Sequence, residues 1–201
     1  MLGGMKKAAA VLFLAAASVL ATIEGAAGGL RWTVPERWEA TAQRPMRVAT
    51  YKIPAAPGSG TEDGECGIFY FGKGQGGSVE ENLERWTAQF EVSAPPKDPT
   101  TGGKPPAVGN AVRSTAVTRV KTVNRLKVHT IEIAGTYLSP GGPMMQSQGK
   151  RPGWRLSGAI VEAPEGLVFF KCTGPAATIE KARKELDALL ASLTPASGSR
   201  T

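Results

Sequence analysis

The clearest helical pattern of apolar positions lies in the stretch GGSVEENLERWTAQF, residues Gly76 to Phe90. Its apolar residues recur at steps of four, three and four: Val79, Leu83, Trp86 and Phe90. This spacing places side chains on one face of an α-helix. Ser78 precedes the run and Glu81 follows three residues later, which is the pattern of a capping box. The stretch predicts an amphipathic helix whose stripe, with Leu83, Trp86 and Phe90, packs into the core.

A second helical pattern lies near the end of the chain, from about Thr178 to Leu193. Its stripe has steps of three and four: Ile179, Ala182, Leu186, Leu189 and Leu193. Pro195 lies just beyond the last periodic residue, where a helix commonly stops. We expect Leu186 and Leu189 to belong to the core.

Between and before the helices the apolar residues favour strands. These runs are Met46–Ile53, Glu65–Phe71, Val108–Val123, Leu126–Leu138, Trp154–Glu162 and Leu167–Cys172. Four consecutive apolar residues in the second run, IFYF, indicate a strand inside the sheet with both faces covered. The last four runs form two antiparallel hairpins. The fold class predicted is therefore α+β, with an antiparallel β-sheet covered by two main α-helices.

The first residues indicate export. Lys6 and Lys7 precede the apolar, alanine-rich run Ala8–Ala21, which is typical of a secretory signal peptide. Cleavage after Ala21 or after Ala27 fits the small residues there, and both sites remain open. The run is short for a membrane span, and no other stretch comes near the required length. We expect a periplasmic or extracellular protein with a signal peptide and spacer over 1–27, one domain over 28–195 and a loose tail over 196–201.

The net charge is +7, and removal of Lys6 and Lys7 leaves 22 basic against 17 acidic side chains, or +5. A basic surface outside the cytoplasm suits anionic envelope components or an acidic protein, and nucleic acid is not expected there. Several cations fall on odd positions of one predicted strand pair, so we expect them to share one face: Arg119, Lys121 and Lys127. That face either binds an anionic partner or is simply the solvated side of the sheet.

Further cations lie in irregular segments. Lys73 lies in the glycine-rich turn Gly72–Gly77, which is either a flexible turn or an anion-binding nest of backbone amides. Lys150 and Arg151 lie in the long segment Ser139–Gly153, and a second long segment covers Ser93–Ala107. Long loops often carry function, so these cations are candidate partner contacts.

The sequence gives little support for a catalytic site or a metal site. The two cysteines, Cys66 and Cys172, lie in predicted strands and either form a disulfide after export or remain buried thiols. Structural zinc needs three or four ligands, and the chain offers these two cysteines and the single histidine, His129. No nucleophile elbow and no convergent acid and base are recognisable. We therefore expect no metal, no cofactor and no enzymatic activity.

The order of elements, the opening segment RWTVPERW and the stretches MRVATY, NLERWTAQF and VFFKCTGP carry a resemblance. The order and the opening segment resemble the PsbP-like fold, over about Trp32 to Leu193, and the three stretches are similar to those of uncharacterised exported bacterial proteins. The resemblance implies an antiparallel sheet between helices, an α/β/α sandwich, and binding or assembly work without a cofactor. It supplies no residue of a known interface.

These observations favour a non-catalytic exported domain that contacts another protein or an anionic envelope component through its basic face and irregular segments. The alternative is a carrier that encloses a small ligand in an apolar cavity.

Overall fold

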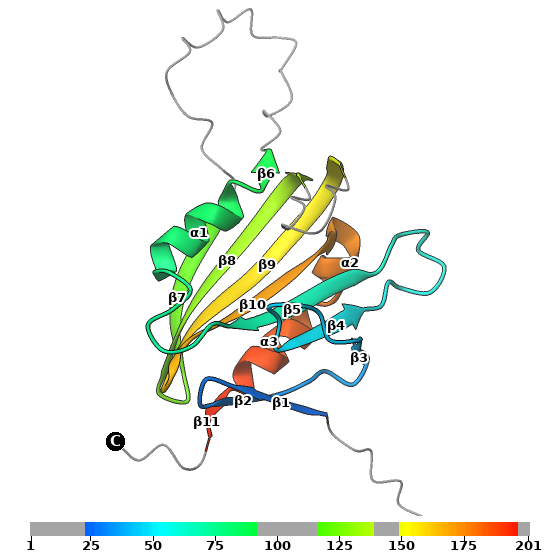
Figure 1. Ribbon diagram of the computed structural model, residues 1–201. Helices are drawn as coiled ribbons and strands as arrows, with labels where there is room; N and C mark the ends of the chain where they lie inside the picture. The colour runs from blue at the N-terminus through cyan, green and yellow to red at the C-terminus, as the bar shows by residue number, and fades with distance from the viewer. Residues whose placement is uncertain (1–22, 92–115, 139–148, 197–201) are drawn as a thin grey trace, which may run out of the picture.

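The computed structural model describes residues 23–91, 116–138 and 149–196, and its main feature is an eight-stranded antiparallel sheet (Figure 1). In spatial order its strands are β3 (Glu39–Ala40), β4 (Ala49–Ile53), β5 (Gly64–Tyr70), β10 (Gly166–Pro175), β9 (Arg151–Ala163), β8 (Leu126–Tyr137) and β6 (Phe90–Glu91). The eighth strand, β7 (Val117–Val123), also pairs with β8. The antiparallel α+β class is therefore confirmed.

A second, three-stranded sheet brings together residues from the two ends of the described chain. It consists of β1 (Glu24–Ala27), β2 (Leu30–Thr33) and β11 (Thr194–Pro195). Gly25 of β1 lies against the Trp32 ring so closely that an added Cβ would be 2.2 Å from it. The domain start that the sequence analysis placed at residue 28 falls between β1 and β2, which are paired with each other.

The first predicted helix is α1 (Val79–Thr87), shorter than the pattern suggested. Its capping box is present: the Glu81 amide donates to the Ser78 hydroxyl at 3.1 Å, and the Ser78 amide donates to the Glu81 carboxylate at 2.7 Å. Phe90, expected on the helix, lies in β6 instead and pairs with Tyr137. It is nevertheless buried in the same apolar cluster as Trp86.

The closing helix is divided in two, α2 (Ala176–Lys181) and α3 (Arg183–Ala191), with Ala182 between them. The described chain thus has three helices where two were expected. Because the interruption is a single residue, the apolar stripe keeps its direction, and Ala182, Leu186 and Leu189 all remain buried.

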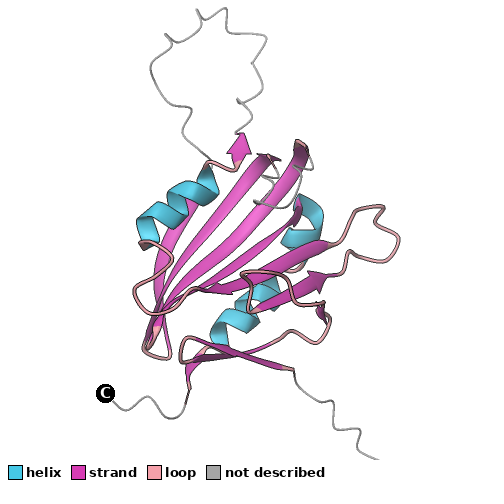
Figure 2. Cartoon of the chain, in the orientation of Figure 1, coloured by secondary structure: helices cyan, strands magenta, loops and turns pink. Residues whose placement is uncertain are grey.

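The helices pack on opposite faces of the sheet and define two apolar clusters (Figures 1 and 2). The larger cluster lies under α2 and α3 and includes Trp32, Trp38, Phe170 and Leu189. The smaller cluster lies under α1 and includes Trp86, Ile131, Ile160 and Phe169. The face that bears α1 is called the α1 face below.

The hairpin between β7 and β8 turns through Asn124 and Arg125, with φ angles of 47° and 69°. Two successive residues at positive φ define the type I′ turn that suits a two-residue hairpin. The predicted turn position is confirmed. The turn pairs Val123 with Leu126, so odd residues of β7 lie opposite even residues of β8.

Candidate functional site

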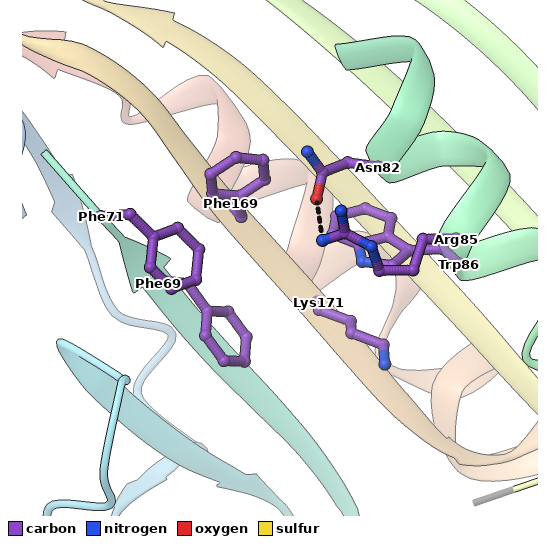
Figure 3. A pocket seen from close by; sticks show the side chains of 7 residues that line it. All are labelled: Phe69, Phe71, Asn82, Arg85, Trp86, Phe169 and Lys171. Carbon is purple, nitrogen blue, oxygen red and sulfur yellow. Dashed lines mark hydrogen bonds between the residues drawn. The ribbon is translucent and has the colours of Figure 1, made fainter. Parts of the chain in front are cut away.

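A shallow groove lies on the α1 face, beside the helix, over the part of β5 and β10 that α1 does not cover. Figure 3 shows side chains of β5 and β10 facing residues of α1 across this groove. It has a volume of about 150 Å³, and its lining residues are Phe69, Phe71, Asn82, Arg85, Trp86, Phe169 and Lys171. Its floor is aromatic: the Phe71 ring lies 5.8 Å from that of Phe169 and 6.3 Å from that of Phe69, centroid to centroid. The groove therefore joins apolar surface to positive charge.

Two glycines open the space in which the groove forms. In register across the sheet, Lys171 lies opposite Gly67 on one side and Gly158 on the other. An added Cβ on Gly158 would be 2.5 Å from the Trp86 ring, and one on Gly67 would be 3.0 Å from the Phe69 ring. Only glycine therefore lets both rings approach the backbone on either side of Lys171.

Lys171 is the unusual residue of the site. Its half-buried ammonium donates a hydrogen bond to the Gln89 side chain and lies 5.6 Å from the Tyr137 ring centroid. Burial lowers the pKa of Lys171 to about 8, and the positive charge of Arg47 adds to the effect while Glu65 opposes it. Among the described residues no carboxylate lies within ion-pair distance of this ammonium. A charge so placed attracts an anion.

Two arginines and one acid lie at the β4 and β5 side of Lys171. The Glu65 carboxylate forms ion pairs with the guanidinium groups of Arg47 and Arg44, with nitrogen–oxygen distances of 2.6 Å and 2.8 Å. The Arg47 guanidinium also lies over the Phe69 ring, 5.4 Å from its centroid. One carboxylate thus offsets two guanidinium groups, and the surroundings of Lys171 keep an excess of positive charge.

The α1 side of the groove is fixed by Asn82, which is buried although the sequence pattern places it off the apolar stripe. Its amide nitrogen donates to the carbonyls of Gly76 and Ser78, each at 2.8 Å. Its oxygen accepts from Arg85 at 3.2 Å, the bond drawn in Figure 3. Arg85 is thereby held at the rim of the groove, near the helix-capping carboxylate of Glu81.

The cations singled out from the sequence do not form one surface. Arg119 and Lys121 of β7 lie opposite Thr130 and Val128, on the face of α2 and α3. Lys127 lies opposite Thr122, on the α1 face, where it meets Glu162 at 3.1 Å. The expectation of one shared face was therefore wrong, because a two-residue turn pairs odd positions with even ones.

The remaining predicted contacts lie apart from the groove lining. Lys150 is paired with Glu91 at 2.5 Å, and Arg151 is paired with Glu62 at 2.7 Å. Lys73 is exposed in the turn after β5. The segment Ser93–Ala107 and most of Ser139–Gly153 lie outside the described residues.

The cysteines form a disulfide that joins β5 to β10, with Cys66 directly opposite Cys172 in the register. It lies on the face of α2 and α3, and each cysteine is adjacent in sequence to a groove position, Gly67 or Lys171. The sequence left this pairing open.

In the described part of the chain, no three His, Cys, Asp or Glu side chains are placed to hold a metal ion. His129 lies beside Glu162 at 2.8 Å and opposite Ile160 in the sheet. No helix among the described segments is long and apolar enough to cross a membrane.

Comparison with known proteins gives structural likeness only, since no family model and no curated protein sequence matches the chain. The cyanobacterial PsbP (CyanoP) of Synechocystis sp. PCC 6803 is similar, with 9% identity and a TM-score of 0.47 over 91% of this chain and 97% of that one. A protein of unknown function from Pseudomonas aeruginosa, PA94, is similar with 10% identity and a TM-score of 0.44 over 87% and 96%. One of these two structures is thus a PsbP, the family that the sequence resembles, and no role of this chain is inferred from either.

Because of Lys171, the free energy of unfolding should depend on pH in the alkaline range. Its folded pKa of about 8 lies below the ordinary value of 10.5, so between these values the unfolded chain binds a proton that the folded protein does not. The contribution of Lys171 to the free energy of unfolding should therefore rise as pH increases from about 8 to 10.5, by up to about 3 kcal/mol. Urea unfolding at several pH values measures this contribution: across this range the free energy of unfolding of the wild type should rise relative to that of Lys171→Met, which has no ammonium at this position.

Lys184→Met is the matched control, because Lys184 is exposed on α3. It should leave the pH dependence unchanged. Parallel curves for the wild type and Lys171→Met would contradict the placement of this ammonium.

Proposed function

We propose that this protein is an exported, non-catalytic binding domain, and that the groove on the α1 face holds an anionic group of an envelope component or of a partner protein. The observation that carries the proposal is Lys171, a half-buried cation without a carboxylate partner in the described chain, between the rings of the groove and Tyr137. Keeping such a charge partly desolvated is costly, and a bound anion would offset that cost.

The composition of the groove indicates what the bound group looks like. Phe69, Phe71 and Phe169 offer an apolar floor, whereas Lys171 and Arg85 offer donors at its edge. A carboxylate or phosphate attached to a flat apolar group satisfies both features. The basic residues predicted from the sequence, Arg119 and Lys121 among them, lie outside this lining.

The size of the groove favours this reading over a carrier of small ligands. Sites that enclose a drug-sized molecule have volumes of about 300 to 1,000 Å³. The groove measures about 150 Å³ and is partly open to solvent. It accommodates one group projecting from a larger molecule, so we favour the binding domain.

The test is a titration of the ¹⁵N-labelled exported protein with phenyl phosphate, which carries both an aromatic ring and an anion. Amide signals of Phe69, Phe169 and Lys171 should shift. Benzyl alcohol, the uncharged counterpart, should shift them far less at the same concentration. Lys171→Met should weaken the phenyl phosphate response by about tenfold, the size expected for a charged hydrogen bond.

Lys184→Met again serves as the control and should bind like the wild type. Raising the pH above 9 should weaken binding to the wild type, because the Lys171 ammonium loses its proton with a pKa of about 8. Equal responses to phenyl phosphate and benzyl alcohol, or an unaltered affinity of Lys171→Met, would contradict an anion site here.

A further inference from the structure

The edge of the main sheet at β7 is a second surface with unusual properties. Six of the seven residues of Val117–Val123 are exposed, and Val120 at the centre keeps 61% of its surface in solvent. On its inner side the strand pairs with β8 along its whole length. Among the described elements none pairs with its outer side. Such an edge offers backbone groups to another strand.

The turn determines which backbone groups face outward. In a two-residue type I′ hairpin the closing pair, Val123 and Leu126, exchanges its hydrogen bonds, and the pairs then alternate along the ladder. The amides and carbonyls of Thr118, Val120 and Thr122 consequently point away from β8. Three consecutive outward positions can pair with an added strand of about seven residues.

The charge along this edge indicates which kind of strand can bind to it. Arg119 and Lys121 project from the same side of β7, and neither has a carboxylate partner within the described residues. A second copy of the chain added edge to edge would bring like charges together, which disfavours that pairing. An extended segment with acidic residues at alternate positions would instead pair with both cations.

We propose that the open edge of β7 binds an extended, acidic segment of another protein by strand addition. Main-chain hydrogen bonds at Thr118, Val120 and Thr122 hold the segment, and Arg119 and Lys121 select its acidic residues. Val120, on the opposite side of the strand, contacts an apolar residue of the added segment. This surface is separate from the groove, so its occupancy does not depend on Lys171.

The probe is a blocked peptide, acetyl-TEVEVET-amide, added to the ¹⁵N-labelled exported protein. We expect shifted signals along Val117–Val123 and slower hydrogen exchange at the amides of Thr118, Val120 and Thr122. The lysine counterpart, acetyl-TKVKVKT-amide, should bind at least about tenfold more weakly because it places like charges opposite the edge.

Two variants test the mechanism. Val120→Pro removes an outward amide without removing a ladder hydrogen bond, so it should keep the fold and abolish binding. Replacing both Arg119 and Lys121 by Glu should reverse the preference between the two peptides. The control replaces Lys73 and Lys184 by Glu, which changes the net charge equally at exposed sites elsewhere. Lys171→Met should also bind the acidic peptide normally.

Several results would overturn the proposal. Equal binding of the two peptides would remove the role of charge, and binding without protected β7 amides would remove strand addition. Unchanged binding to Val120→Pro would do the same. Concentration-dependent dimerisation of the free protein that Val120→Pro abolishes would show that a second copy occupies the edge instead.

Discussion

Replacing Trp86 by Ala should lower the free energy of unfolding by about 3 to 5 kcal/mol, as large aromatic truncations do in cores. Trp86 is 5% exposed and lies in the cluster between α1 and the sheet. Its ring fits against Gly158, where no Cβ intervenes. The substitution would leave a cavity over a glycine, and the rigid sheet cannot close it. Urea denaturation monitored by far-ultraviolet circular dichroism measures the loss.

Leu83→Ala is the matched control on the same helix. Leu83 is only partly buried against the same cluster, so its truncation should cost clearly less than that of Trp86. Gly158→Ala should destabilise as well, because its Cβ would collide with the Trp86 ring. Equal losses for Trp86→Ala and Leu83→Ala would contradict the packing of α1 described here.

Removing the disulfide should have an effect of similar size. Cys66 and Cys172 are 106 residues apart, so the bond closes a long loop in the unfolded chain. The chain-entropy model gives a stabilisation of about 4 to 5 kcal/mol for a loop of this length. The paired substitution Cys66→Ala and Cys172→Ala avoids leaving a reactive thiol and should lower the urea midpoint accordingly.

A non-reducing peptide map of the protein should first show the two cysteines in one linked peptide. The doubly substituted protein should keep its far-ultraviolet spectrum, because both positions remain paired in the ladder between β5 and β10. Unfolding midpoints that agree within error for the two proteins would show that the bond contributes nothing to stability.

Local chemistry made several elements predictable from sequence. Ser78 and Glu81 specify the start of α1 because both hydrogen bonds of the capping box form within one turn. The turn at Asn124 and Arg125 lies where the apolar pattern of two strands is interrupted. In each case the signal and the structure lie within a few residues of one another.

Features that depend on contacts between distant residues could not be predicted from the sequence in this way. Phe90 keeps the helical spacing, yet it reaches the core from β6, because pairing with Tyr137 overrides the period. The closing helix is interrupted at Ala182, where the sequence has no proline or glycine that would predict a break. Lys127 was assigned to the wrong face because the parity of a hairpin depends on the exact length of its turn.

The groove was missed because its residues come from three distant segments. Phe69, Trp86 and Lys171 meet only when β5, α1 and β10 are assembled. One signal was present: a single lysine interrupts the apolar run LVFFKC. A charged residue within such a strand marks either an exposed edge or a functional position. Because β10 lies inside the sheet, the explanation of an exposed edge does not apply to Lys171, which makes this lysine a candidate for the second.

The small sheet also bears on the signal-peptide cleavage that the sequence predicts. Cleavage after Ala27 would remove all of β1, which is one of the two partner strands of β2, together with the glycine that lies against the Trp32 ring. Cleavage after Ala21 would leave that strand whole, together with the bond from the Val34 amide to the Ile23 carbonyl at 2.8 Å. If a signal peptidase processes the chain, as the sequence predicts, the complete small sheet therefore requires cleavage ahead of Ile23.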